Sequence, residues 1–216
     1  MDKSKGRVVS VNESLVGAEI TEGAVINGEV AYIIIEDGKR LKSEVIDVKT
    51  DNMVYLQVFE DTSWMKFGDP VEFSGLPLAV KLGPGILGSV TDGLQNPLYE
   101  LAKIEWFLER GLEVEPLDNT VKWDFTPSVK KGDVVTGGSV LGSVPEKLFE
   151  HKIFVPFSMQ GNYTVEHITE KGDYTIDEDI ATIKDAEGNS IKLQMAFDWP
   201  VKKSMPFHER SFFHRF

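Results

Sequence analysis

The sequence predicts a mainly β protein: a six-stranded β-barrel, then a barrel-like sandwich domain, with one helix between them. Three observations support this fold class. Short β-branched runs separated by turn residues fill residues 6–73. A Lys-Gly-Asp sequence occurs twice in the second half, beginning at Lys131 and at Lys171. Apolar residues recur at helical spacing over the segment that begins near Asn96.

The N-terminal strands are short and are separated by polar turns. Asp37-Gly38 is a typical hairpin turn, and the strands on either side of Thr50-Asp51-Asn52 are expected to pair. About six strands of this length favour a closed barrel, because closure leaves no exposed sheet edge. The strands that the pattern delimits are residues 8–11, 15–19, 29–36, 41–48 and 53–59.

The stretch Gly83–Leu98 contains four glycines and two prolines. Glycine loosens the backbone and proline removes a hydrogen-bond donor, so neither a helix nor a central strand is expected here. Apolar side chains nevertheless occur at spacing typical of a core. We therefore expect buried backbone at a junction between domains. The apolar residues concerned are Ile86, Leu87, Val90 and Leu94.

The one clear helix is predicted to follow this stretch. Asn96 is a suitable N-cap and Pro97 suits the first helical position. Gly111 is expected to end the helix. The residues expected to form its apolar face are Leu101, Ile104 and Leu108.

The second half contains an internal repeat, Val129–Val144 and Ile168–Ile183. Each copy reads as a strand, a Gly-Asp turn and a second strand, and a β-branched residue follows nine positions after the lysine (Val140 and Ile180). Two such units interlock in biotinyl and lipoyl carrier domains, which is the fold expected here. After Ile191 a last strand and an extended return are expected.

The composition excludes several classes of partner. The net charge of −12 disfavours nucleic acid and anionic membrane surfaces, which both require lysine and arginine. The chain has no cysteine, so it has neither disulfides nor thiolate metal sites. Apolar residues never form an uninterrupted run of eighteen, so no direct membrane insertion is expected.

Several polar groups are candidates for catalytic or metal-binding residues. Asp92 precedes Gly93, and Glu60-Asp61 precedes Thr62-Ser63. Both settings favour carboxylates that stabilise turns over acid-base catalysts. The histidines lack metal-binding spacing and are expected to be surface or partly buried residues. These histidines are His151, His167, His208 and His214.

A long run of the sequence resembles the catalytic A subunit of V-type and archaeal-type rotary ATPases. The chain reads QVFEDTS from Gln57, GDPV from Gly68, and SGLPLAVKLGPGILGSVTDGLQNPL from Ser74 to Leu98. That family carries G-x-PL-x-V-x-LGPG-x-LG-x-(I/V)-x-DG-(I/L)Q-x-PL at the same spacing. GRVVSV at Gly6–Val11 and the late Trp199-Pro200-Val201 are also similar, so the resemblance spans nearly the whole chain.

The resemblance implies a domain order. It places the N-terminal barrel at residues 1–74, the junction and helix that begin a central nucleotide-binding domain at 75–113, the bulge domain at 114–191, and a return segment toward the central domain at 192–216. The family's P-loop would lie beyond this sequence, since no G-x-x-x-x-G-K-[ST] occurs in its 216 residues. The final SFFHRF departs from the family. We expect the N-terminal portion of an A subunit, either an excised segment or a truncated product.

The resemblance also implies a function. The full subunit would hydrolyse or make ATP with magnesium while rotation drives proton or sodium transport. This chain is expected to hold no catalytic, cofactor-binding or metal-binding residue and to be catalytically inert. It would supply assembly surfaces, the barrel for B subunits of the ring and the bulge for peripheral stalk subunits. The expected location is cytoplasmic, peripheral to the membrane.

The alternative is a free-standing carrier or binding protein built on the biotinyl/lipoyl-like sandwich. Carrier domains display a modified lysine on a hairpin between the two halves, often within Met-Lys-Met. The corresponding connection here is expected to be PEKLFEHKIFVPF, which contains Lys147 and Lys152. Neither lysine has the flanking residues, so neither biotin nor lipoate is expected on them.

Overall fold

The computed structural model describes residues 3–36, 38–49, 52–104, 111 and 114–204. The described residues form two compact units. One falls within Met1–Ala79 and Asp92–Val114, and the other within Val80–Thr91 and Glu115–Phe216. Each unit has its own buried apolar core, and we describe each by itself.

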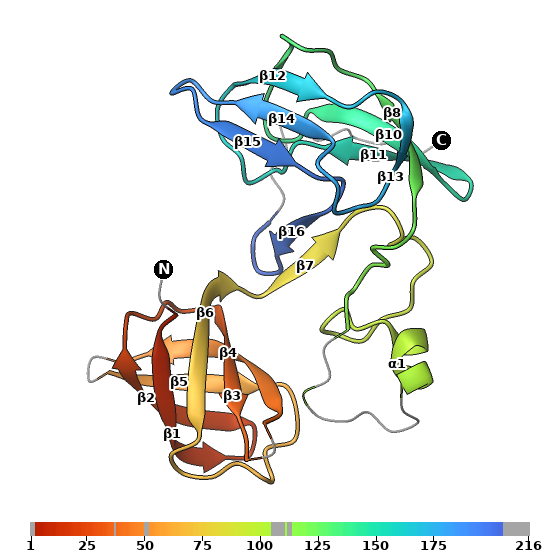
Figure 1. Ribbon diagram of the computed structural model, residues 1–216. Helices are drawn as coiled ribbons and strands as arrows, with labels where there is room; N and C mark the ends of the chain where they lie inside the picture. The colour runs from red at the N-terminus through yellow and green to blue at the C-terminus, as the bar shows by residue number, and fades with distance from the viewer. Residues whose placement is uncertain (1–2, 37, 50–51, 105–110, 112–113, 205–216) are drawn as a thin grey trace, which may run out of the picture. The chain divides into compact units, whose positions relative to one another are not determined.

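The first unit contains a closed antiparallel barrel with the strand order β1-β2-β5-β4-β3-β6 (Figure 1). The predicted six-stranded barrel is therefore confirmed. β6 closes it, because Val71 pairs with Gly6 of β1 on one side and with Ile33 of β3 on the other. The strands are β1 Lys5–Asn12, β2 Leu15–Glu22, β3 Glu29–Ile34, β4 Arg40–Val48, β5 Met53–Val58 and β6 Pro70–Pro77.

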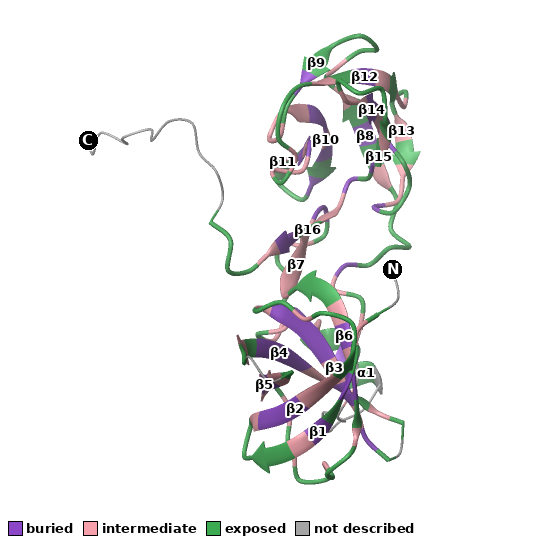
Figure 2. Cartoon of the chain, turned by 90° about the vertical axis from the view of Figure 1, so that its left-hand side faces the viewer, coloured by how far each residue is buried: buried purple, intermediate pink, exposed green. Residues whose placement is uncertain are grey.

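The interior of the barrel follows from the two-residue period of its strands. Along β5, Val54, Leu56 and Val58 are buried and the residues between them are partly exposed. Phe73 of β6 contributes the largest fully buried apolar side chain to this core. Figure 2 shows the buried residues distributed along all the barrel strands. Alternation in the sequence thus accounts for which side chains fill the barrel.

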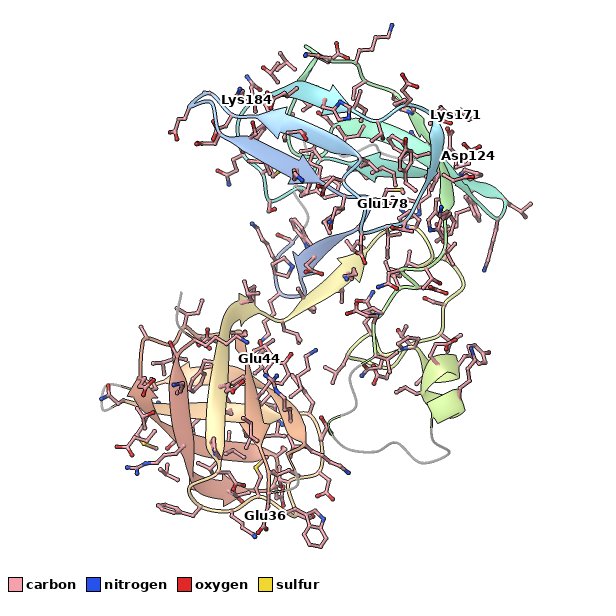
Figure 3. The ribbon with its side chains drawn as sticks, viewed as in Figure 1. Glu36, Glu44, Asp124, Lys171, Glu178 and Lys184 are labelled. Carbon is pink, nitrogen blue, oxygen red and sulfur yellow. The ribbon has the colours of Figure 1, made fainter. Side chains whose placement is uncertain are left out.

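Two carboxylates are also buried in the barrel unit. Glu29 opens β3, and Glu44 lies on β4 beside it, where it pairs with Val30 (Figure 3). Burial raises the pKa of Glu29, although hydrogen bonds from the amides of Ile26 and Gly75 oppose this. These amides hold the carboxylate where β3 begins.

The helix begins slightly later than its sequence signals predict. α1 spans Leu98–Ile104, and the carbonyl oxygen of Pro97 accepts a 3.0 Å hydrogen bond from the amide of Leu101. Pro97 therefore occupies the capping position, and the Asn96 side chain binds Asp92 instead. Leu101 is buried as predicted. Leu108 lies outside the described residues.

The second unit is a sandwich of two four-stranded sheets, ordered β11-β10-β8-β13 and β15-β14-β12-β9 (Figure 1). This confirms the predicted barrel-sandwich. A separate two-stranded sheet joins β7 Ala79–Leu82 and β16 Phe197–Pro200. The sandwich strands are β8 Trp123–Pro127, β9 Val134–Val135, β10 Val140–Glu146, β11 Phe149–Phe154, β12 Tyr163–Ile168, β13 Gly172–Tyr174, β14 Ala181–Lys184 and β15 Ser190–Leu193.

In the structure each copy extends beyond the repeated residues to a unit of four strands, β8 to β11 for the first copy and β12 to β15 for the second. The two copies interlock by exchanging their short second strands. β9 belongs to the first copy but pairs with β12 of the second, and β13 of the second copy pairs with β8 of the first. Lys171 and Asp124 come from different copies, yet their side chains lie 3.6 Å apart (Figure 3). Because each sheet contains strands of both copies, neither half can complete its sheet alone.

The Lys-Gly-Asp sequence adopts different structures in the two copies. In the first copy the predicted turn is confirmed: Asp133 accepts a 2.8 Å hydrogen bond from the amide of Lys130, and Gly132 has a φ of 94°. In the second copy the predicted turn is wrong, since Gly172 and Asp173 lie in β13. Pairing with β8 holds these residues in an extended conformation.

The sandwich core extends past Ile191. That predicted boundary falls inside β15, whose last residue, Leu193, is buried in one apolar cluster. Met195 is buried in the other cluster together with Phe125. The Phe125 ring packs directly over Gly142, where an added Cβ would lie 2.5 Å from its Cε2 atom. Gly142 is therefore required by close approach within the core.

Candidate functional site

The glycine-rich stretch is not the buried segment that its composition predicts. Gly83 and Pro84 are buried, but Leu87 and Val90 are exposed, and Val90 is 48% exposed. The expectation of buried apolar residues is therefore wrong for Leu87 and Val90, whereas Ile86 and Leu94 are half-buried. The exposed residues belong to a loop whose backbone is held by a polar side chain.

That side chain is Glu146, the last residue of β10, which is only 2% exposed. Its Oε1 atom accepts hydrogen bonds from the amides of Gly85 and Leu87, at 2.9 and 3.0 Å. Its Oε2 atom lies 2.5 Å from Nδ1 of His151. Backbone amides that converge on one anion, here those of the alternate residues Gly85 and Leu87, form an anion-binding site of the kind found in backbone nests. Here the bound anion is a carboxylate of the chain itself.

The next residue, Lys147, holds the same loop from the opposite side of Leu87. Its Nζ atom donates a 2.9 Å hydrogen bond to the carbonyl oxygen of Leu87. The amide and carbonyl groups of Leu87 are therefore both satisfied by consecutive side chains of opposite charge. The loop also needs glycine at position 85, where φ is 99°.

The two-residue alternation along β10 indicates that Glu146 is buried, although this residue was not among the predicted functional residues. Val144 points into the sandwich core, and Glu146 lies two residues further along the same strand, so both face the same side. A glutamate beside a lysine is ordinarily read as an exposed hairpin residue. Its partners lie about sixty positions earlier in the sequence, and no local pattern predicts that contact.

The segment PEKLFEHKIFVPF does not connect the two halves, so that expectation is wrong. It forms the β10–β11 hairpin inside the first copy, where Glu146 pairs with Phe149 around a two-residue turn. Lys147 has a φ of 54° in this turn, and Lys152 lies on β11. The connection between the copies runs from the end of β11 to Tyr163, where β12 begins.

Asp92 stabilises a turn, as its position before Gly93 predicts. Its Oδ1 atom accepts hydrogen bonds from the amides of Leu94 and Asn96, both at 2.8 Å, and its Oδ2 atom accepts one from the Asn96 side chain. Burial alone would raise the pKa of Asp92, but these hydrogen bonds outweigh it and lower the pKa below its ordinary value. A carboxylate held ionised in this way is suited to a structural role.

Glu60 and Asp61 also bind backbone groups, as predicted. Asp61 accepts hydrogen bonds from the amide and hydroxyl of Ser63, at 3.0 and 2.5 Å. Glu60 accepts a 2.6 Å hydrogen bond from the amide of Gly111. The pair therefore caps a turn and a neighbouring segment. Both carboxylates thus make structural contacts of the kind expected.

The histidines are dispersed. His151 is partly buried against Glu146 and His167 is exposed, while His208 and His214 lie outside the described residues. Within the described ranges, no three histidine, cysteine or acidic side chains gather as metal ligands. The same part of the chain holds no helix with the length and apolar character needed to span a membrane.

Sequence comparisons identify the two domains. The model of the ATP synthase alpha/beta family beta-barrel domain matches residues 3–75, and that of the ATP synthase alpha/beta subunit barrel-sandwich domain matches residues 114–202. The chain belongs to the ATP synthase alpha/beta family. The barrel match covers β1 to β5 and most of β6. The barrel-sandwich match includes Leu193 and Met195, in agreement with their burial in the sandwich core.

Relatives within this family are similar over nearly the whole chain. The V-type ATP synthase alpha chain of Treponema denticola is 48% identical over 95% of the chain. The V-type ATP synthase alpha chain 1 of Treponema pallidum is 46% identical over 96% of it, and the alpha chain of Borreliella burgdorferi strain ZS7 is 46% identical over 92%. The chain spans 34–35% of the length of these relatives.

Proposed function

We propose that this chain is the N-terminal part of a V-type ATP synthase alpha chain and that it supplies surfaces for assembly of the complex. The observation that carries the proposal is the order of the two domains, barrel and then sandwich, in a chain 46–48% identical to such alpha chains. The full alpha chain would hydrolyse or make ATP while rotation drives proton or sodium transport.

We propose that the 216-residue chain has no nucleotide site of its own. Phosphoryl transfer requires amides around the phosphates, a lysine and a magnesium ligand, and the sequence holds no P-loop. Among the described residues, the amides of Gly85 and Leu87 offer an equivalent of a phosphate cradle, but they already bind Glu146. A phosphate would have to displace a buried carboxylate against the field of a chain whose net charge is −12.

We therefore expect calorimetry with ATP and magnesium to show no heat of binding in the tens of micromolar, and turnover to stay at the blank rate. The Glu146→Ala variant is the matched control, because the substitution removes the carboxylate that binds the amides of Gly85 and Leu87. Saturable micromolar binding of ATP to the unaltered chain that is lost in Gly85→Val would contradict this prediction.

Exposed apolar side chains suggest where each domain contacts its partners. In the barrel unit, Trp64 and Phe67 lie on the loop between β5 and β6, and Phe67 is 79% exposed. In the sandwich, Leu148 and Phe149 lie at the β10–β11 turn, and Leu148 is 95% exposed. Large apolar side chains in water-exposed turns are typical of contact sites. We propose that B subunits contact the first pair and peripheral stalk subunits the second.

Serine substitutions at the two pairs test this assignment and serve as controls for each other. We expect Trp64→Ser with Phe67→Ser to weaken co-purification with the B subunit of the same organism by about tenfold, as removal of interface anchors commonly does. Binding to peripheral stalk subunits should be unchanged. Leu148→Ser with Phe149→Ser should give the reverse result. Full binding by both double variants would refute the proposed surfaces.

A further inference from the structure

The loop Gly83–Ser89 contains a site for one anion. The amides of Gly85 and Leu87 both point to Oε1 of Glu146, whereas the intervening amide of Ile86 points away and contacts the carbonyl oxygen of Gly83 at 3.4 Å. Alternate amides that converge in this way concentrate positive potential at one point. Backbone geometry therefore makes this part of the loop attractive to a carboxylate.

The carboxylate in this site is almost fully removed from water. The side chain of Glu146 is 3% exposed, and His151 contacts its second oxygen. Burial of an ionised carboxylate is costly unless hydrogen bonds replace its hydration. The loop amides provide those hydrogen bonds, and Glu146 in turn satisfies two loop amides. The loop conformation and the burial of Glu146 thus depend on each other.

The second copy of the repeat provides an internal comparison. Its hairpin between β14 and β15 carries Asp185 in the turn, one residue after the end of β14, and that carboxylate accepts hydrogen bonds from the amides of Glu187 and Asn189 in the same turn. Glu146 instead binds residues about sixty positions earlier. Both hairpins thus carry a carboxylate that binds backbone amides, but only the one in the first copy binds a loop that is distant in the sequence.

We propose that the Gly83–Ser89 loop is a carboxylate-binding site, that Glu146 is its built-in ligand, and that this contact latches the loop to the β10–β11 hairpin. Lys147 completes the latch through the carbonyl oxygen of Leu87. The site accepts a small carboxylate such as formate or acetate when the Glu146 carboxylate is removed. This inference concerns the sandwich unit alone and does not depend on the proposed function.

Amide hydrogen exchange of the 216-residue chain, followed by NMR, tests the latch. In Glu146→Ala, the Gly85 and Leu87 amides should exchange at least about tenfold faster, because hydrogen bonds to a charged acceptor are lost. Added formate or acetate should restore their protection in a saturable way. Sodium chloride at the same ionic strength should not. The amide of Val165, which bonds to Asp133 within the sandwich, should remain protected and report that the fold persists.

Two further variants keep the test decisive. Asp185→Ala should accelerate exchange only at Glu187 and Asn189, because that carboxylate caps its own turn. Glu146→Gln keeps the side-chain volume and removes the charge, so it should accelerate hydrogen exchange at the amides of Gly85 and Leu87. Acetate should not restore their protection, since the carboxamide of the glutamine side chain still fills the site. It also serves if Glu146→Ala fails to fold. The proposal is overturned if Gly85 and Leu87 stay protected in the folded variants, or if formate and acetate act no differently from chloride on folded Glu146→Ala.

Discussion

A segment that ends at Ile191 is expected to lose the cooperative unfolding of the sandwich, whereas a segment of residues 80–204 is expected to retain it. Ending at Ile191 cuts β15 and removes Leu193 and Met195, which are buried in the two apolar clusters. Deletion of a large buried side chain costs about 2–5 kcal/mol. Two such losses approach the whole stability of a typical domain, about 5–15 kcal/mol.

Thermal unfolding and NMR would compare residues 114–191 with residues 80–204. Dispersed amide signals and a sharp melt are expected only for the longer segment. A third segment, residues 114–204, separates the effect of the C-terminal core residues from that of the latched loop. It should fold with reduced stability, because Glu146 then lacks the amides of Gly85 and Leu87. A cooperative melt of residues 114–191 would show that the core closes without β15.

Phe73→Ala is expected to destabilise the barrel by about 3–5 kcal/mol, the usual cost of removing a buried aromatic ring. The sandwich should be unaffected, because the cluster that contains Phe73 lies wholly within the barrel. Phe125→Ala should destabilise the sandwich and leave the barrel unaffected, since Phe125 lies in a cluster confined to the sandwich unit. The two phenylalanines are both almost fully buried, so each variant is a matched control for the other.

Calorimetric unfolding with residue-resolved NMR would assign each transition to its unit. Phe73→Ala should lower the melting temperature reported by barrel amides alone, and Phe125→Ala that reported by sandwich amides alone. If either substitution lowered both transitions equally, the two units would share one cooperative core. Independent transitions would show that each of the two matched family domains unfolds as a separate cooperative unit.

The barrel could be predicted because its signals are local. Gly38, the described residue of the predicted Asp37-Gly38 turn, lies between β3 and β4 with a φ of 80°, whereas Asp37 lies outside the described residues. The alternation along β5 specifies which of its side chains are buried. Strand β6 was not delimited from the pattern, because the pairing that defines it involves β1 and β3, far away in the sequence. The turn residues predicted which strands that follow each other in the sequence would pair. Closure of the barrel depended on pairing between strands that are distant in the sequence.

The errors arose where distant residues decide local structure. The second Lys-Gly-Asp reads like the first, yet it becomes strand β13 because β8 of the other copy pairs with it. PEKLFEHKIFVPF reads like a linker between repeats but folds as the β10–β11 hairpin, because Glu146 pairs with Phe149. Helix α1 was predicted correctly in type and place, with its start shifted beyond Pro97.

By itself the sequence determined the fold class, the order of barrel and sandwich, and the family, because alternation, turn residues and motif spacing are all properties of short segments. Only the tertiary structure decided that the two copies exchange β9 and β13, that the sandwich core extends to Met195, and that Glu146 binds the glycine loop. The physical reason is the same in each case. Burial of Met195 and Glu146 depends on groups far away in the sequence, and a carboxylate is stable inside a protein only where the fold brings hydrogen-bond donors to it.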